Sequence, residues 1–123
     1  MTTLLDTNIL IDYFREKPSA VLFVEGLNRK PSVSVCTVME LMAGARNQQE
    51  EGQIESLPRS ASIIPVTLDI ARIAGQHVKH YRRSHGLDDL DALIAATAVH
   101  HGLKLATINV KHFPMLKGLK RAY

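Results

Sequence analysis

Leu4-Leu5-Asp6-Thr7-Asn8-Ile9-Leu10-Ile11 is the stretch that decides the fold, because an acidic residue stands where a short apolar strand gives way to a helix. In open α/β sheets, ligands bind beyond the carboxyl ends of the strands, so an acid in this position faces a cleft. Asp6 and Thr7 are also favoured N-cap residues, and a helix cap alone would explain both of them. The local residues leave these two interpretations open.

Length and composition are those of an ordinary globular domain. The chain has 123 residues, of which 46% are hydrophobic and 22% charged, and we expect a single domain over residues 1–123. Cys36 is the only cysteine, so no internal disulfide can form and a zinc site is not expected. No window approaches the roughly 18 apolar residues of a membrane span, so we expect a soluble cytoplasmic protein. The net charge of +3 permits a polyanionic partner.

Short apolar runs alternate with amphipathic segments along the chain, which favours parallel crossover connections and a sheet flanked by helices. Strands are expected at residues 4–5, 33–35, 63–66 and 103–108, and helices at 8–14, 19–27, 37–45, 70–81 and 88–100. Gly86 and Gly102 stop the last two helices. Residues 46–59 are interpreted as a solvated helix end and a connection, and residues 118–123 as a final strand.

Two further acids stand in comparable positions. Glu40 completes Thr37-x-x-Glu40, which also matches a capping box. Asp91 lies deeper in its predicted helix, and the positions three, four and seven residues later carry small or apolar side chains, which let a ligand or another backbone come close. Asp88 shares roughly the same side of the helix. First-turn charges favoured by the helix dipole are the alternative explanation for Asp88 and Asp91.

Convergence of Asp6, Glu40 and Asp91 would require a cation. Two carboxylates about 4 Å apart repel by about 4 kcal/mol at an effective dielectric of 20, against a domain stability of about 5 to 15 kcal/mol. Oxygen ligands select hard divalent ions such as Mg²⁺ or Mn²⁺. A metal held in this way binds phosphodiester oxygens and lowers the pKa of a bound water. This is the chemistry of a nuclease.

The sequence resembles the PIN-domain ribonucleases, in particular the VapC-like toxins of type II toxin-antitoxin systems, over essentially its whole length. The resemblance is carried by four motifs that occur in order at the spacing of the family. They are Leu4-Leu5-Asp6-Thr7-Asn8-Ile9-Leu10, Thr37-x-x-Glu40-Leu41, Asp91-Ala92-Leu93-Ile94-Ala95-Ala96-Thr97-Ala98, and Leu105-Ala106-Thr107-Ile108-Asn109-x-x-His112-Phe113.

The resemblance implies a fold, an activity and partners. It implies a three-layer α/β/α sandwich around a mostly parallel sheet, in which Asp6, Glu40 and Asp91 are the catalytic, metal-binding carboxylates. The implied reaction is endonucleolytic hydrolysis of RNA by metal-activated water, with Mg²⁺ or Mn²⁺ as cofactor and transfer or ribosomal RNA as the substrate class. The implied assembly is a homodimer that a cognate antitoxin inhibits.

The chain departs from the family at one position. Asn109 stands where many members have a fourth Asp, and an amide offers a carbonyl oxygen but no charge. Binding of a single metal is therefore expected in the free protein, unless Asp88 supplies a further ligand. Thr7, Asn8 and Thr107 are expected to hold the ligands in place.

Basic residues rather than acidic ones should contact the RNA. Candidates are Lys79, Arg82 and Arg83 at the end of one predicted helix and Lys111 late in the chain, although an ordinary solvated surface explains them equally well. Contacts to phosphates do not specify a sequence, so the target RNA is not determined. The alternatives are a non-catalytic PIN-fold interaction module and a phosphatase with Asp6 as nucleophile. The phosphatase usually needs a second Asp where this chain has Asn8.

Overall fold

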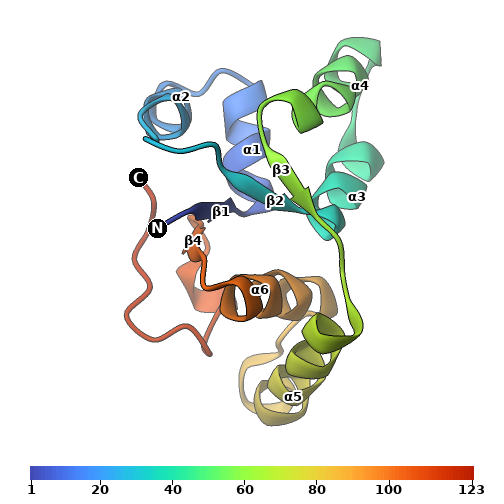
Figure 1. The fold of residues 1–123 in the computed structure, drawn as a ribbon, viewed down its shortest axis with the longest axis vertical. Helices are drawn as coiled ribbons and strands as arrows, with labels where there is room; N and C mark the ends of the chain where they lie inside the picture. Colours follow the sequence, from blue (N-terminus) through green and yellow to red (C-terminus); the bar gives the residue numbers. More distant parts are fainter.

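A parallel sheet of four short strands forms the centre of the computed structural model, which describes residues 1–123 (Figure 1). The strands are β1 (Thr3–Leu5), β2 (Ser32–Ser34), β3 (Ser62–Ile64) and β4 (Lys104–Ala106). Their order across the sheet is β3-β2-β1-β4, and every pair is parallel. The chain moves outward from β1 to β3 and then returns to the other side of β1. The strand order therefore reverses between β1 and β4, where open α/β sheets place their ligands.

Six helices cover the two faces of the sheet. They are α1 (Thr7–Phe14), α2 (Pro18–Glu25), α3 (Val35–Gly44), α4 (Gln48–Glu55), α5 (Leu68–His85) and α6 (Asp89–His101), with short 3-10 turns η1 (Leu57–Arg59) and η2 (Val110–His112). Helices α1 to α4 lie on one side of the sheet, and α5 and α6 lie on the other (Figure 1). This arrangement confirms the predicted α/β/α sandwich. None of the helices is both long enough and apolar enough to cross a membrane.

The core is divided by the sheet because successive side chains of a strand point to opposite faces. Leu5 of β1 packs with Ile9 of α1 on one face. Leu4 packs on the other face with Ile94 and Ala95 of α6. All five side chains are at most 1% exposed. The opening stretch of the sequence therefore anchors both layers of helices.

Helix α6 lies between the sheet and α5. The apolar stripe of α5, with Ile70 and Ala74, packs against Ala92 and Ala96 of α6 rather than against the sheet. Small side chains allow the two helices to approach closely while the opposite side of α6 contacts the sheet. Ala95 and Ala98, the small residues four and seven positions after Asp91, pack on the sheet side with Leu4, so another part of the protein approaches them, which is one of the two possibilities that the sequence left open.

Two segments differ from the prediction. Residues 46–59 are not a connection: they contain α4 and η1, and Asn47 caps α4 by accepting a hydrogen bond from the Glu50 backbone N–H at 2.9 Å. The helix was missed because Ile54 is its one buried side chain, too few for an apolar period. Residues 118–123 form no strand, and the Ala122 N–H donates to the Thr107 carbonyl while Ala122 and Tyr123 pack against the core.

The boundary between β2 and α3 also differs. Ser34 is the N-cap of α3, with its hydroxyl accepting from the Cys36 N–H at 3.1 Å, so Val35 begins the helix instead of ending the strand. The capping box proposed for Thr37 and Glu40 is therefore wrong, because both residues lie inside the helix. Gly86 and Gly102 end α5 and α6 in the left-handed conformation, as expected.

Candidate functional site

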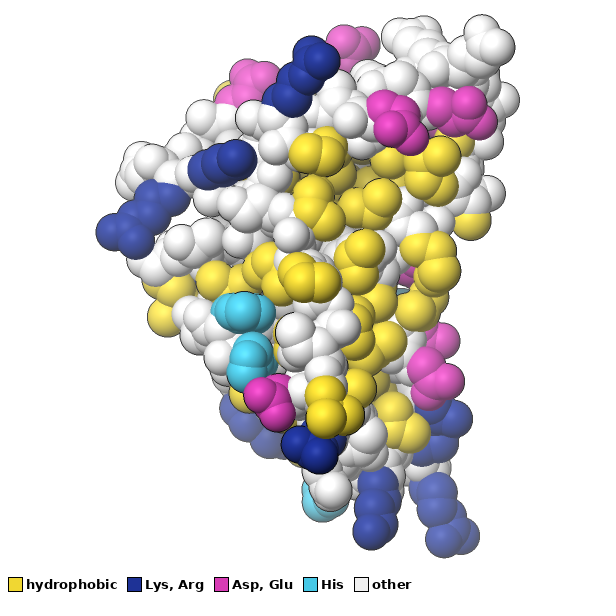
Figure 2. Space-filling view, turned by 45° about the vertical axis from the view of Figure 1, so that its right-hand side comes forward, with side chains coloured by type: hydrophobic (Ala, Val, Ile, Leu, Met, Phe, Trp, Pro, Cys, Tyr) yellow, Lys and Arg dark blue, Asp and Glu magenta, His cyan; other side chains and the backbone are white.

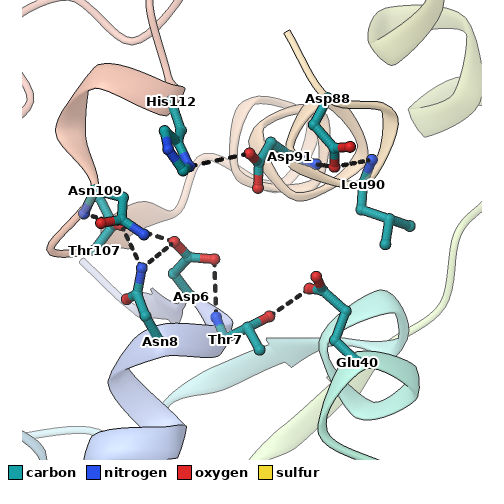
Figure 3. A network of polar contacts seen from close by, with 10 residues as sticks. All are labelled: Asp6, Thr7, Asn8, Glu40, Asp88, Leu90, Asp91, Thr107, Asn109 and His112. Atoms are coloured by element: carbon teal, nitrogen blue, oxygen red, sulfur yellow. Dashed lines mark hydrogen bonds and ion pairs between the residues drawn. The ribbon is translucent and has the colours of Figure 1, made fainter. Parts of the chain in front are cut away.

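Asp6 is both a helix cap and a buried carboxylate at the carboxyl end of β1. One oxygen, Oδ1, accepts the Thr7 backbone N–H at 2.8 Å, and Asp6 is the N-cap of α1. The other oxygen, Oδ2, accepts the Thr107 hydroxyl at 2.7 Å and the Asn8 amide at 3.2 Å (Figure 3). Asp6 is only 4% exposed, and this burial raises its pKa against the opposing effect of these hydrogen bonds. The two interpretations of Asp6 are compatible.

Thr107 connects β1 to the loop that follows β4. Its fully buried hydroxyl donates to Asp6 and accepts the backbone N–H of Asn109 at 3.0 Å, which places Asn109 at the same edge of the sheet. The Asn8 amide donates to Asp6 and, at 3.4 Å, to Thr107. Its carbonyl Oδ1 is buried and has no hydrogen-bond partner. Asn8 and Thr107 therefore hold the Asp6 side chain in place.

Glu40 reaches the same edge from α3. Its Oε1 accepts the Thr7 hydroxyl at 2.6 Å, and Thr7 Oγ1 lies 3.0 Å from the hydroxyl of Thr37, which is fully buried. Because the Thr7 proton goes to the carboxylate, the Thr37 hydroxyl donates to Thr7. The sequence suggested Thr7 as a supporting residue, but it gave Thr37 only a capping role. The second hydroxyl could be found only from the packing of α3 on α1.

Asp91 and Asp88 have different environments in α6. Asp88 is the N-cap, and its Oδ2 accepts the backbone N–H groups of Leu90 and Asp91 at 3.0 and 3.3 Å. Asp91 lies in the first turn with a side chain 20% exposed, and its Oδ2 is 3.4 Å from Nδ1 of His112. Capping thus explains Asp88, whereas capping does not explain Asp91.

The carboxylates repel one another. Burial, followed by the negative charges of Asp6, Asp88 and Glu40, raises the pKa of Asp91 to about 6, and His112 opposes the shift. Among these charges, Asp6 has the largest effect. No lysine or arginine forms an ion pair with Asp6, Glu40 or Asp91. Asp6 after β1, Glu40 of α3 and Asp91 of α6 therefore direct negative charge into a common space without a lysine or arginine to compensate it (Figure 3).

This donor set suits a hard divalent cation that keeps much of its water. No three acidic, histidine or cysteine side chains are close enough to form a complete protein cage. Mg²⁺ is commonly held by one or two carboxylates together with several waters. Asp6 and Asp91 match that requirement, and Asp6 is the charge that raises the pKa of Asp91 most. A closed zinc-type site, with four protein ligands, does not fit.

The residues predicted to contact RNA differ in whether they already have a partner within the protein. Arg82 donates from Nε to the Leu87 carbonyl at 2.8 Å and pairs with Asp89, so it ties together the turn between α5 and α6. Lys79, Arg83 and Lys111 form no ion pair. The structural contact of Arg82 has no signal in the sequence, because it links two helices across a turn.

The architecture and the acidic edge define an α/β nuclease-like domain, and the comparisons agree. The PIN domain family model matches residues 3–113. The chain belongs to the PIN domain family, and within it to the VapC-like members.

Several VapC proteins align with nearly the whole chain. The chain is 41% identical to ribonuclease VapC19 of Mycobacterium tuberculosis over 98% of both proteins. It is 32% identical to the tRNA(fMet)-specific endonuclease VapC of Shigella flexneri, over 95% of this chain and 93% of that one. A toxin-antitoxin complex from Klebsiella pneumoniae contains a similar chain, with 34% identity, a TM-score of 0.84 and coverage of 99% of this chain and 98% of that one.

Proposed function

We propose that the chain is the toxin of a toxin-antitoxin pair, an endoribonuclease that depends on Mg²⁺ or Mn²⁺ and hydrolyses RNA phosphodiester bonds. The observation that carries the proposal is the pair of carboxylates on the buried Asp6 and the half-buried Asp91, which lie at the point where the strand order reverses and have no lysine or arginine partner. The names of the similar proteins from Mycobacterium tuberculosis and Shigella flexneri support it.

Each residue has a distinct part in this proposal. Asp6 and Asp91 would hold the cation, and when bound it supplies a water of lowered pKa and charge stabilisation for the leaving oxygen. Thr107 and Asn8 orient Asp6, and Thr7 orients Glu40.

Glu40 and Asn109 complete the proposed site. The hydrogen bond to Glu40 goes to Oε1, so Oε2 is free to accept a proton from an attacking water. Asn109 contributes an uncharged oxygen, which makes a second metal the weaker one. Oδ2 of Asp88 is occupied by the two capping hydrogen bonds of α6, so Asp88 is not assigned to the metal here.

The name of one relative and three basic side chains without ion pairs support a proposal for the substrate class. The relative from Shigella flexneri is named for a transfer RNA, and we propose structured RNA of the transfer or ribosomal class as the substrate. Lys79, Arg83 and Lys111 form no ion pair, so they can contact phosphates. Arg82 is committed to the α5–α6 turn.

The proposed partners are a cognate antitoxin and a second copy of the chain. The similar Klebsiella pneumoniae structure is a toxin-antitoxin complex. For the homodimer, the support is an exposed apolar surface on α3 and the start of α5, visible as a field of hydrophobic side chains in Figure 2. It includes Val35, Met39, Met42, Val66 and Leu68, which are 37% to 66% exposed. A surface of this kind on a small domain is typical of a protein interface.

RNA cleavage by purified protein free of antitoxin tests the proposal. Total RNA is incubated with the protein in Mg²⁺, in Mn²⁺ and in chelator, and the variants Asp6→Asn and Asp91→Asn are compared with Asp69→Asn. Asp69 is a matched control because it is an acid in a first helical turn with a side chain 67% exposed.

We expect cleavage that requires the metal, is lost in the first two variants and is retained in the control. Cleavage that survives both chelation and substitution would contradict the proposal. If the folded protein cleaves no RNA under any of these conditions, the result would instead indicate a non-catalytic interaction module.

A further inference from the structure

A cavity of about 170 Å³ lies beside the carboxylates, between η2 and the turn that joins α5 to α6. We call it the turn pocket. It is lined by His85, Asp88, Asp91, Lys111 and His112, together with Gly86 and Leu87. Because Asp91 belongs both to this pocket and to the proposed metal centre, a group bound in the pocket adjoins the bond to be cleaved.

Lys111 provides an uncommitted positive charge at the pocket. Its ammonium pairs with no carboxylate, although Asp88 and Asp91 line the same cavity. Arg82, the nearby cation on α5, is instead fixed by the Leu87 carbonyl and by Asp89. An exposed ammonium with no partner in the protein is suited to a phosphate of the substrate.

His85 provides an exposed aromatic ring that two neighbouring side chains restrain. Its Nδ1 lies 2.7 Å from the Ser84 hydroxyl, and its ring packs edge-on against Tyr81 with centroids 5.5 Å apart. A ring restrained in this way loses little conformational freedom when it binds a ligand. Nucleobases of unpaired RNA stack on side chains of this type.

The carboxylates of the pocket retain free acceptor atoms. The two capping hydrogen bonds of Asp88 go to Oδ2, so Oδ1 remains unbonded. A bare anion would be repelled by Asp88 and Asp91. A nucleotide suits this mixed lining better, because its ribose hydroxyl donates to a carboxylate while its phosphate meets the ammonium.

We propose that the turn pocket binds the RNA nucleotide next to the cleaved bond. Lys111 contacts its phosphate, the His85 ring lies against its base, and Asp88 Oδ1 accepts its 2′-hydroxyl. This inference rests on the proposed function for the identity of the substrate, and it adds to that function a binding site that favours ribose over deoxyribose.

Binding of a small probe tests the pocket without any cleavage. A ribonucleoside 3′,5′-bisphosphate and its 2′-deoxy counterpart are titrated in chelator into isotope-labelled protein, and backbone amide shifts are followed by NMR. We expect the ribonucleotide to shift the amides of residues 85–88 and 111–112 and to bind more tightly than the deoxy form. Lys111→Ala should weaken binding by about 5- to 10-fold, and Lys111→Arg should largely retain it.

Lys30→Ala is the matched control, because Lys30 is an exposed lysine without an ion pair at the opposite end of the strands, just before β2. It should bind the bisphosphate like the unmodified protein. Asp88→Asn preserves the helix cap but replaces a free acceptor by an amide, and it should reduce the preference for ribose.

Cleavage kinetics separate this inference from the proposed function. We expect Lys111→Ala to raise KM for RNA more than it lowers kcat. If RNA is cleaved normally and Lys111→Ala matches Lys30→Ala in both assays, the pocket assignment is wrong and the proposed function stands. If no RNA is cleaved but the bisphosphate binds in a manner dependent on Lys111, the nucleotide pocket is supported and the proposed function fails.

Discussion

Replacement of Asp91 by Asn will stabilise the metal-free protein at neutral pH, although it removes a residue proposed to be essential for activity. The reason is the electrostatic environment of Asp91, whose pKa is raised to about 6 by burial and by the charges of Asp6, Asp88 and Glu40. An amide of the same shape carries no charge to be desolvated or repelled. Active sites commonly lower the stability of the folded protein in this way.

The magnitude follows from the pKa. A rise from 3.8 to about 6 corresponds to about 3 kcal/mol against the ionised form. The Asp91 side chain is partly exposed, and solvent screening reduces the expected gain to about 1 to 2 kcal/mol. For a chain of this length, the melting temperature should rise by about 3 to 10 °C.

The pH dependence has a definite sign. The folded protein holds the Asp91 proton more tightly than the unfolded chain, so its stability decreases as pH rises from about 4 to about 6 and then levels off. The advantage of Asp91→Asn should therefore be complete above pH 6 and absent below about pH 4.

Urea denaturation in chelator at pH 7.5 and pH 4 measures this effect, with Asp69→Asn as the exposed control, for which no gain is expected. In the unmodified protein, Mg²⁺ at ten times its Kd should add about 1.4 kcal/mol, and Asp91→Asn should lose this increment. A decrease in the free energy of unfolding of the variant at pH 7.5, or an equal gain at both pH values, would refute the reasoning.

Three further predictions concern other parts of the chain. Thr7→Val, compared with Thr7→Ser, should lower the free energy of unfolding by about 1 to 3 kcal/mol in urea, because Glu40 loses its hydroxyl donor. Gly75→Ala should stabilise α5 by about 0.5 to 1 kcal/mol, because the added Cβ meets no neighbour. Gly86→Ala should destabilise the folded protein by about 1 kcal/mol or more, because Gly86 has a φ of +62°. The two variants should therefore shift the melting temperature in opposite directions. Met39→Asp should convert the proposed dimer to a monomer in light scattering; an unchanged mass would place the interface elsewhere.

Sequence alone determined the elements whose signals are local. An apolar run followed by Asp6 marked the end of a strand, the stripe of α5 marked a helix, and Gly86 and Gly102 marked helix ends. These features depend on near neighbours in the chain, so pattern and residue chemistry suffice to predict them. Helix α4 was not predicted, because a single buried side chain produces no apolar pattern.

Tertiary structure decided which side chains meet. Thr7 and Glu40 are 33 residues apart in the chain and Asp6 and Thr107 are 101 apart, yet both pairs form hydrogen bonds. Such contacts depend on the order of parallel strands and on the packing of α3 against α1, which no local period encodes. The sequence thus indicated which acids to consider. The tertiary structure then distinguished the helix cap Asp88 from Asp91, because only Asp91 is half-buried beside other negative charges.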